Sequence, residues 1–282
     1  MSDSDAHRPL TPADLRPSAE PLRVGRVIRA LETIDSTNTF LRQHASELGD
    51  GAVAWAEHQA AGRGRQGRRW ESPRGAGVLL SVLLREPESS ALVGLAAIVG
   101  ALAACEAVSA ASLCRPVVRW PNDLYVNGRK LGGVLAECFA WPDAAGPPGG
   151  AMQSATRCVG LVIGVGINCL QQAGHFDPTL RESATSLEIE SREPVDRATV
   201  ARALLERLDA WCAACAASGG RREVLSAWKR HCSELGSRIV LDSAGRTYAG
   251  TIIDVTDEGD LLVQLDEGGR AHFAAATTTR RH

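Results

Sequence analysis

The chain has 282 residues, of which 44% are hydrophobic and 23% are charged. This composition is typical of a soluble globular protein with one large or two modest domains, and the length allows a core that needs no disulfide or metal. The formal net charge of −2 excludes a global basic field that would attract nucleic acid or an anionic membrane, so any anion binding must be local.

Cysteine usage and the N-terminus indicate a reducing compartment. Eight cysteines are scattered along the chain, mostly in apolar segments, and residues 1–21 lack the apolar core of a signal peptide. We therefore predict buried thiols in the cytoplasm and no disulfide framework. Cys212 and Cys215 have the spacing of a redox or metal motif, but they lie in an alanine-rich helical stretch with no second pair, so we interpret them as structural.

The first half of the chain alternates between extended and helical patterns. Residues 1–23 are rich in proline and polar residues, and we expect a mobile segment. The predicted elements that follow are a strand at 24–31, a helix from about 35 to 49, strands at 52–57 and 78–85, and a helix at 91–111. The last helix is long enough to cross a bilayer. However, it is rich in Ala and Gly and contains Glu106, so we interpret it as a buried helix under a sheet.

Turn signals organise the middle of the chain. Asn127-Gly128 is a strong type I′ hairpin signal, and Trp120-Pro121-Asn122-Asp123 follows a short strand. Residues 139–156 contain several prolines and glycines and are predicted to form a long hairpin loop or an insertion. The strands predicted around these turns lie at 117–119, 124–126, 130–137 and 159–168.

Three glycines, Gly160, Gly164 and Gly166, lie in the strand predicted at 159–168. Residues two apart in a strand share one face, so these glycines leave room for a ligand to rest against bare backbone. The alternative is a bulge or close packing against a helix.

The C-terminal part of the chain changes character at Leu235-Gly236. Helices are predicted at 194–217 and 221–232, before this point. After it, short alternating runs are separated by glycine-rich turns. This pattern predicts a small all-β domain over 235–282 with the form of a barrel.

The most unusual stretch is GRGRQGRRW at residues 62–70, in which three glycines alternate with four arginines before a tryptophan. Glycine allows the backbone to approach a ligand closely, and the arginine fork suits carboxylates and phosphates. We interpret this run as a mobile loop that wraps a polyanion; the alternative is a solvated basic turn. A second polar cluster, Asp35-Ser36-Thr37-Asn38, lies at a predicted helix start, where it either holds a polar ligand group or is a plain helix cap.

Six motifs resemble, in order and spacing, those of the bacterial biotin protein ligases, also called biotin–[acetyl-CoA-carboxylase] ligases. They are Ser36-Thr37-Asn38, Glu57-His58-Gln59, GRGRQGRRW, Arg119 followed by WPND, Arg129-Lys130-Leu131-Gly132-Gly133, and Gly164-Val165-Gly166-Ile167-Asn168. The resemblance covers about residues 24–275, and it is the combination of motifs that is specific, because any one alone is weak. Family members that repress transcription carry an N-terminal winged helix-turn-helix, whereas about 23 residues precede the first predicted strand here. Gln66 also stands where the family often has a basic residue.

The resemblance implies an α+β fold, in which a class II synthetase-like mixed β-sheet flanked by helices is followed by a small SH3-like barrel. The catalytic, biotin- and ATP-binding domain would span 24–234 and the SH3-like domain 235–282. The implied reaction has two steps: biotin and Mg-ATP give biotinyl-5′-AMP and pyrophosphate, and the biotinyl group then passes to a lysine of a biotin carboxyl carrier protein. The carrier would belong to acetyl-CoA carboxylase or a similar carboxylase. We expect no specific DNA binding, because of the near-neutral charge and the short N-terminal segment, and no membrane association; a homodimer is a possible assembly.

The chemistry of the reaction needs positive charge at one point. Bringing a carboxylate to the α-phosphate of ATP opposes like charges, by roughly 4 kcal/mol at 4 Å for an effective dielectric of about 20. Lys130, beside a glycine-opened strand, is the best candidate to offset this repulsion, with Arg65 as a second cation. No protein nucleophile is needed, so rate comes from positioning and electrostatic stabilisation. Asp123 is the candidate general base for the incoming lysine.

The resemblance also assigns ligand-binding residues. The biotin-binding set is Ser36, Thr37, Asn38, Gln59, Gly62, Arg63, Gly64, Arg65, Lys130, Gly133, Gly164 and Gly166. The nucleotide-binding set is Arg65, Arg68, Trp70, Asn122 and Asn168. Asn122 and Asp123 are candidates to position Mg²⁺ or the incoming lysine, although the ATP phosphates are expected to hold most of the metal's coordination.

Other readings stay open at this point. Lipoate or octanoate ligases resemble this chain in architecture but lack the GRGRxGRxW loop. A biotin-sensing DNA-binding regulator is disfavoured by the near-neutral charge and the short N-terminal segment. A non-catalytic anion-binding module would make Lys130 and the WPND cluster incidental.

Overall fold

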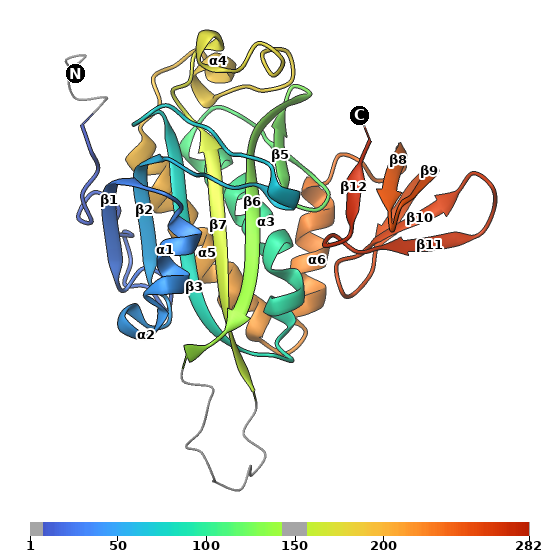
Figure 1. Cartoon of the computed structure of the whole chain (residues 1–282), viewed down its shortest axis with the longest axis horizontal. Helices are drawn as coiled ribbons and strands as arrows, with labels where there is room; N and C mark the ends of the chain where they lie inside the picture. The colour runs from blue at the N-terminus through green and yellow to red at the C-terminus, as the bar shows by residue number, and fades with distance from the viewer. Residues whose placement is uncertain (1–7, 143–156, 282) are drawn as a thin grey trace, which may run out of the picture.

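Two β-sheets and three long helices make up the computed structural model, which describes residues 8–142 and 157–281 (Figure 1). The larger sheet has the strand order β1-β2-β3-β7-β6-β5-β4. Its first pair, β1 and β2, is parallel and the other neighbours are antiparallel, so the sheet is mixed, as predicted. The strands are β1 (Ile28–Ile34), β2 (Val53–Gln59), β3 (Gly77–Pro87), β4 (Val117–Arg119), β5 (Asp123–Val126), β6 (Arg129–Ala140) and β7 (Cys158–Asn168).

Helices cover both faces of this sheet. The long helices α3 (Ala91–Ala111), α5 (Arg197–Ala216) and α6 (Gly220–His231) pack together behind it in Figure 1, and the short helices α1 (Thr37–Gln43) and α2 (Ala45–Leu48) lie in front. The larger apolar core lies between the sheet and the long helices. A smaller core, which includes Leu41, Leu83 and Trp141, lies under α1 and α2.

Helix α3 is the one helix of the described residues that is long and apolar enough to cross a membrane, and 72% of its most apolar window is buried within the protein. The predicted interpretation as a buried helix is therefore confirmed. Its small residues allow a close approach to the sheet. A Cβ at Gly100 would lie 2.7 Å from Val134 and 2.9 Å from Ile163, so only glycine fits at this contact.

The predicted hairpin between β5 and β6 is present. Asn127 and Gly128 have φ values of 48° and 78°, as a type I′ turn requires, and Val126 pairs with Arg129 across it. The next hairpin joins β6 to β7, which pair from Gly132–Ile167 to Ala140–Val159. The loop or insertion predicted at 139–156 falls largely outside the described residues.

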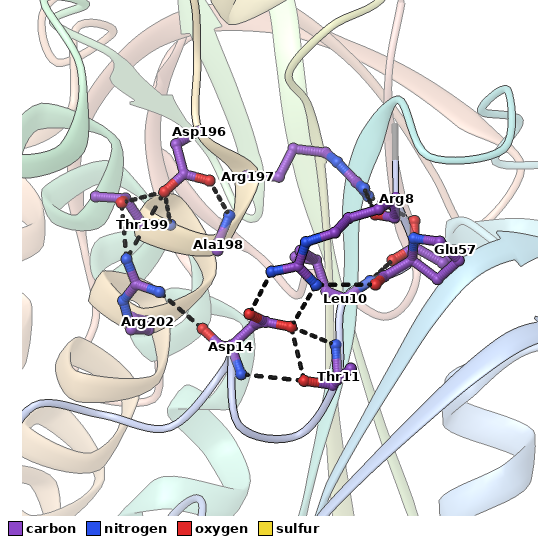
Figure 2. Close-up of polar contacts among 11 residues, drawn as sticks. Arg8, Leu10, Thr11, Asp14, Glu57, Asp196, Arg197, Ala198, Thr199 and Arg202 are labelled. Atoms are coloured by element: carbon purple, nitrogen blue, oxygen red, sulfur yellow. Dashed lines mark hydrogen bonds and ion pairs between the residues drawn. The ribbon is translucent and has the colours of Figure 1, made fainter. Parts of the chain in front are cut away.

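Residues 8–24, the N-terminal segment, pack against the body of the protein, in contrast to the mobile segment that we predicted for 1–23. Leu15 is fully buried, and the Leu10 N–H donates to Glu57 at 2.7 Å (Figure 2). The N–H groups of residues 22–24 all donate to the Asp209 carboxylate of α5, at 2.7 to 2.8 Å. Buried carboxylates on the body thus hold a segment whose own composition suggested mobility.

Several element boundaries differ from the prediction for local reasons. The first strand begins at Ile28 rather than at residue 24, because the Val24 N–H bonds to Asp209 and Gly25 turns the chain with a φ of 99°. The helix predicted over 35–49 is divided at His44 into α1 and α2. A short helix, α4 (Leu187–Ser191), was not predicted.

The C-terminal part is a five-stranded antiparallel sheet with the order β11-β10-β9-β8-β12. It confirms the predicted all-β segment and adds β12, which was not predicted. Strand β12 pairs with β8 and lies beside the helical layer of the main body in Figure 1. The strands are β8 (Arg238–Ser243), β9 (Arg246–Val255), β10 (Leu261–Leu265), β11 (Arg270–Phe273) and β12 (Thr278–Arg280).

Candidate functional site

A cavity of about 140 Å³ lies between the larger sheet and the glycine–arginine loop, residues 62–70. The loop leaves β2, crosses over β7 and β6 and returns to β3 (Figure 1). The cavity therefore has strands as its floor and the loop as its cover. Its lining residues are Ser36, Thr37, Asn38, Gln59, Arg63, Gly64, Arg65, Arg68, Arg69, Trp70, Asn122, Asp123, Lys130, Gly133, Val134, Leu135, Gly164, Val165 and Gly166.

One end of the cavity is lined by neutral polar groups from the start of α1. The Gln59 side-chain oxygen accepts from the Thr37 N–H at 2.8 Å and from the Thr37 hydroxyl at 3.0 Å. Ser81 of β3, which is fully buried, lies 2.6 Å from the Thr37 hydroxyl and donates to Asn38 at 2.6 Å. Ser36 is the N-cap residue of α1, yet its side chain does not cap that helix. This end presents fixed donors and acceptors to a neutral polar ligand group.

The middle of the cavity holds the Lys130–Asp123 ion pair. Lys130 Nζ lies 2.7 Å from Asp123 Oδ1, and the two side chains are 33% and 27% exposed. They come together because Asp123 pairs with Gly133 across the β5–β6 hairpin, where a register shift follows Leu124. A Cβ at Gly133 would lie 3.0 Å from Asp123 and 3.7 Å from Lys130, so glycine leaves the space that both side chains use. Lys130 is further fixed by backbone hydrogen bonds to Ser183 and Thr185.

The glycine–arginine loop is a narrow hairpin. Gly62 and Trp70 are joined by a backbone hydrogen bond of 3.0 Å, and Arg63 pairs with Arg69 one step further on. A Cβ at Gly62 would lie 2.3 Å from the Trp70 carbonyl oxygen. Gly62 is therefore needed to close the hairpin. We predicted that it binds biotin, but it is not among the residues that line the cavity.

Arginines give the cavity a positive cover. Arg63 donates to Glu137 of β6 at 2.8 Å, a half-exposed ion pair across the cavity mouth. Arg65 donates to the Asn122 side chain at 2.9 Å, and burial lowers the pKa of its guanidinium. Among the described residues, the hydrogen bonds of Arg65 all go to neutral oxygens. No carboxylate of these residues is bonded to its guanidinium directly, so its charge favours an anion nearby. Arg68 and Arg69 also line the cavity.

The glycines of β7 lie against side chains, and two of them, Gly164 and Gly166, also line the cavity. A Cβ at Gly164 would lie 2.1 Å from Asn38 Oδ1, and a Cβ at Gly166 would lie 2.7 Å from the Trp70 ring. Packing against helix α1, one of the two alternatives from the sequence, therefore accounts for Gly164. Gly160 faces the Phe139 ring, at 2.3 Å from such a Cβ, and it does not line the cavity.

Asn168, predicted to face the nucleotide, lies outside the cavity. Its side chain is buried, donates to the Thr185 carbonyl at 3.0 Å and accepts from Gln171 at 3.0 Å. In this structure it ties the end of β7 to the segment before α4. The other predicted residues, apart from Gly62, are brought together around the cavity.

Sequence reasoning missed six residues at the site. Arg69, Val134, Leu135 and Val165 line the cavity, and Ser81 and Glu137 hold residues that do. A serine inside the apolar run Val78–Leu84 and a glutamate on a strand were available signals for the last two. No group of three or more His, Cys, Asp or Glu that could hold a metal occurs in the part of the chain that the structure describes.

Comparison with known proteins places the chain in one family. Residues 30–140 match the profile of the Biotin/lipoate A/B protein ligase family. The chain is 31% identical to the Biotin--[acetyl-CoA-carboxylase] ligase of Mycobacterium tuberculosis over 98% of this chain and 97% of that relative. It is 32% identical to the Bifunctional ligase/repressor BirA of Escherichia coli, over 86% of this chain and 70% of that relative.

A solved structure has the same fold. The chain is similar to a biotin protein ligase from Aquifex aeolicus in complex with biotin and ATP, with a TM-score of 0.73 and 24% identity, over 91% of this chain and 99% of that chain. The motifs, the Mycobacterium tuberculosis relative aligned over nearly its whole length and the shared fold agree. The chain belongs to the biotin/lipoate A/B protein ligase family and, within it, to the biotin protein ligases.

Proposed function

We propose that this protein is a ligase that activates biotin with ATP to biotinyl-5′-AMP and transfers biotin to a lysine of a biotin carboxyl carrier protein. The carrier would be that of acetyl-CoA carboxylase, which the name of the Mycobacterium tuberculosis relative specifies, or of a similar carboxylase. The observation that carries the proposal is the cavity itself, because it joins a neutral polar end to a cationic middle under a loop of arginines.

The cavity suits the two ends of biotin. The ureido group is neutral and has both donors and acceptors, which matches Ser36, Thr37 and Gln59 at the polar end. Val134, with an apolar side chain, and Gly164, with bare backbone, line the path between the ends. The biotin carboxylate would then lie near Lys130, whose charge offsets its repulsion from the α-phosphate.

The chemistry needs positioning more than reactive side chains. In the first step a biotin carboxylate oxygen bonds to the α-phosphorus of ATP, and the bond to pyrophosphate breaks. In the second step the carrier lysine nitrogen bonds to the acyl carbon, AMP leaves, and the amine loses a proton. Lys130 and Arg65 stabilise the charge that develops in the first step, and Asp123 is the candidate acceptor of the proton in the second.

Mg²⁺ would enter with ATP as part of the substrate. Asn122 and Asp123, the candidate oxygen ligands, already accept from Arg65 and Lys130 respectively. Their arrangement does not fit a resident metal site formed by the protein, so we assign the metal to the ATP phosphates. We also propose that residues 24–234 form a class II synthetase-like catalytic domain and residues 235–282 an SH3-like domain.

Label transfer tests the proposal directly. The protein is incubated with ATP, radiolabelled biotin and a carrier-protein fragment, and in parallel with radiolabelled lipoate. We expect ATP-dependent label on the carrier lysine from biotin only, and none on a carrier in which that lysine is replaced. Transfer of lipoate with no transfer of biotin would contradict the proposal, as would biotin binding without ATP–pyrophosphate exchange.

A further inference from the structure

Gln66 stands at the tip of the glycine–arginine loop, and its side chain points out of the cavity toward the C-terminal sheet. It donates to the Thr278 carbonyl at 3.2 Å and accepts from the Thr279 hydroxyl at 2.8 Å. Its own backbone is left-handed, with φ 56° and ψ 38°, a conformation that costs energy for any residue with a Cβ. Contacts made by the side chain are what hold this residue in place.

Its two partners are fixed parts of the C-terminal sheet. Thr278 and Thr279 belong to β12 and pair with Ser243 and Asp242 of β8. Thr278 is 1% exposed, and its hydroxyl donates to the Ser243 hydroxyl at 3.2 Å. The loop tip is therefore bonded to an ordered strand of the second sheet.

Arg65, the neighbour of Gln66, strengthens the same link. Its guanidinium donates to the Ala275 carbonyl and to the Thr278 carbonyl, the latter at 3.2 Å. The opposite face of the same side chain lines the cavity and bonds Asn122. Displacement of β12 would thus be transmitted to a cation inside the cavity.

We infer that Gln66 is a positioning residue that latches the glycine–arginine loop to β12, so that the C-terminal sheet determines how long the loop retains biotinyl-AMP. The inference rests on the proposed function. Gln66 does not line the cavity, so it acts through the loop that covers the cavity. Gln66 stands where the family often has a basic residue. Its neutral amide can accept from Thr279 as well as donate to Thr278.

The test starts from the β12 side, because replacing Gln66 would also change the strain of a left-handed residue. Thr279→Val removes the hydroxyl and keeps the shape, Thr279→Ser keeps the hydroxyl, and Thr277→Val is the matched control. Thr277 is exposed, and no side-chain hydrogen bond is made by it among the described residues. Biotinyl-AMP is formed on each protein, an excess of unlabelled biotin and ATP is added, and release of labelled adenylate is followed.

We expect Thr279→Val to release adenylate about fivefold faster than wild type, which is the effect of one lost hydrogen bond. Thr279→Ser should restore retention, and Thr277→Val should match wild type. Gln66→Ala should also speed release, and in a double variant with Thr279→Val the effects should not add, because both remove the same contact. Urea unfolding of each variant separates loss of the latch from loss of stability.

Two outcomes overturn the inference. One is release from Thr279→Val at the wild-type rate, and the other is additive effects of Gln66→Ala and Thr279→Val. ATP–pyrophosphate exchange by the wild-type protein distinguishes this failure from failure of the proposed function. Exchange with unaltered release means that the function stands and the latch does not, whereas absence of exchange removes the function itself.

Discussion

Lys130 and Lys229 are the two lysines of the chain, and only the first lies at the cavity. Lys130 bonds Asp123 at 2.7 Å, and Lys229 bonds Asp254 at 2.6 Å on the surface. The two ion pairs are alike in geometry but differ in place. Lys229 is therefore a natural control for the charge that we assign to Lys130.

Lys130→Ala should lower the rate of biotinyl-AMP formation by at least about a hundredfold, the usual effect of removing one charge-stabilising group from a transition state. ATP–pyrophosphate exchange measures it, with circular dichroism to check the fold. Lys229→Ala should keep wild-type exchange. Near wild-type exchange by Lys130→Ala would contradict a role for Lys130 in adenylate formation and would leave it as a surface residue of the β5–β6 hairpin.

At the scale of single residues, Glu57 and Arg197 form a buried ion pair. Both side chains are 3% exposed and 2.8 Å apart. Glu57 also accepts from Leu10 and Trp55, so one carboxylate joins the N-terminal segment, β2 and α5 (Figure 2). Removing one partner leaves the other charge buried and unpaired, and this costs more than the pair itself contributes.

We expect Glu57→Gln to lower the free energy of unfolding by about 3–5 kcal/mol, because Arg197 would remain charged and buried. Urea denaturation measures this change. The matched control is Glu32→Gln, which breaks an exposed pair with Arg74 at 3.4 Å and should cost below about 1 kcal/mol. Equal effects of the two variants would show that burial of the Glu57 pair has no energetic consequence.

At the scale of elements, helix α5 depends on its N-cap residue, Asp196. Its carboxylate accepts from the N–H groups of Ala198 at 3.0 Å and Thr199 at 3.2 Å (Figure 2). Burial opposes ionisation, but hydrogen bonds from the Thr199 hydroxyl and these two N–H groups outweigh it and lower the pKa of Asp196 below its usual value of 3.8. A carboxylate with a lowered folded pKa stabilises the fold above the unfolded pKa, and this contribution is lost as the pH falls through the folded pKa.

Asp196→Ala should therefore destabilise the protein by about 1 kcal/mol at pH 7, and the difference from wild type should shrink as the pH falls below about 3.8. Urea midpoints of both proteins across this pH range test the expectation. Asp196→Asn keeps a capping oxygen without a titrating charge, so its stability relative to Asp196→Ala should not depend on pH. If the stability difference between wild type and Asp196→Ala stays constant with pH, the ionised Asp196 carboxylate does not stabilise the helix.

The glycine–arginine loop makes separable contacts through its arginines. Arg63 bonds Glu137 across the mouth of the cavity, whereas Arg68 is exposed and lines the cavity without a side-chain hydrogen bond or ion pair to another described residue. We expect Arg63→Gly to form biotinyl-AMP but to release it early, so that exposed lysines of unrelated proteins become labelled. Arg68→Ala should raise the KM for ATP without such labelling. Adenylate release and stray labelling, measured for both variants in parallel, distinguish them; wild-type retention by Arg63→Gly would mean that the loop is no lid.

Local signals explain which elements could be predicted from the sequence. The Asn127-Gly128 turn, the apolar helix α3 and the loop at 62–70 each have a pattern contained within one segment, and all are present. Strand β12 was missed because its three residues have no alternating apolar pattern and it is defined by pairing with β8.

The cavity residues were predictable as far as the family motifs reach. Most of the residues named from those motifs line it, and the membership of the biotin protein ligases is confirmed. Asn168 belongs to a motif, yet its side chain bonds Thr185 and Gln171, which lie outside the motifs. The contact of Gln66 with β12 joins residues 212 and 213 positions apart, so no local pattern could indicate it.

At the scale of the whole molecule, the candidate site lies on the larger sheet and is connected to the C-terminal sheet through its loop. The larger sheet supplies its floor, and Arg65 joins the loop to the C-terminal sheet. Strand β12 is tied to the main body a second time, through the Arg280–Glu234 ion pair, and Glu234 accepts from the Trp120 N–H at 3.2 Å. Movement of one sheet relative to the other would therefore alter the cavity.

Thiol reactivity reports on the integrity of the whole core. Cys105, Cys169 and Cys212 are at most 1% exposed, and burial raises the pKa of each to about 12. Partial burial also raises the pKa of Cys138, but this residue is exposed and a reagent can reach it. With iodoacetamide near neutral pH, we expect Cys138 to be modified first and these three only after urea unfolding. Mass spectrometry of peptides gives the order. Rapid native modification of Cys169 would contradict the packing described here.

The hydrogen bonds from residues 22–24 to Asp209 have a consequence for folding during synthesis. The ribosome adds about 5–20 residues per second, and 185 to 187 residues separate the three donors from this carboxylate. The N-terminal segment therefore leaves the ribosome roughly 10 to 40 s before its acceptor is synthesised. During that time the N–H groups of residues 22–24 are bonded to water. A nascent chain that ends before α5 lacks Asp209, so its N-terminal segment cannot form these hydrogen bonds.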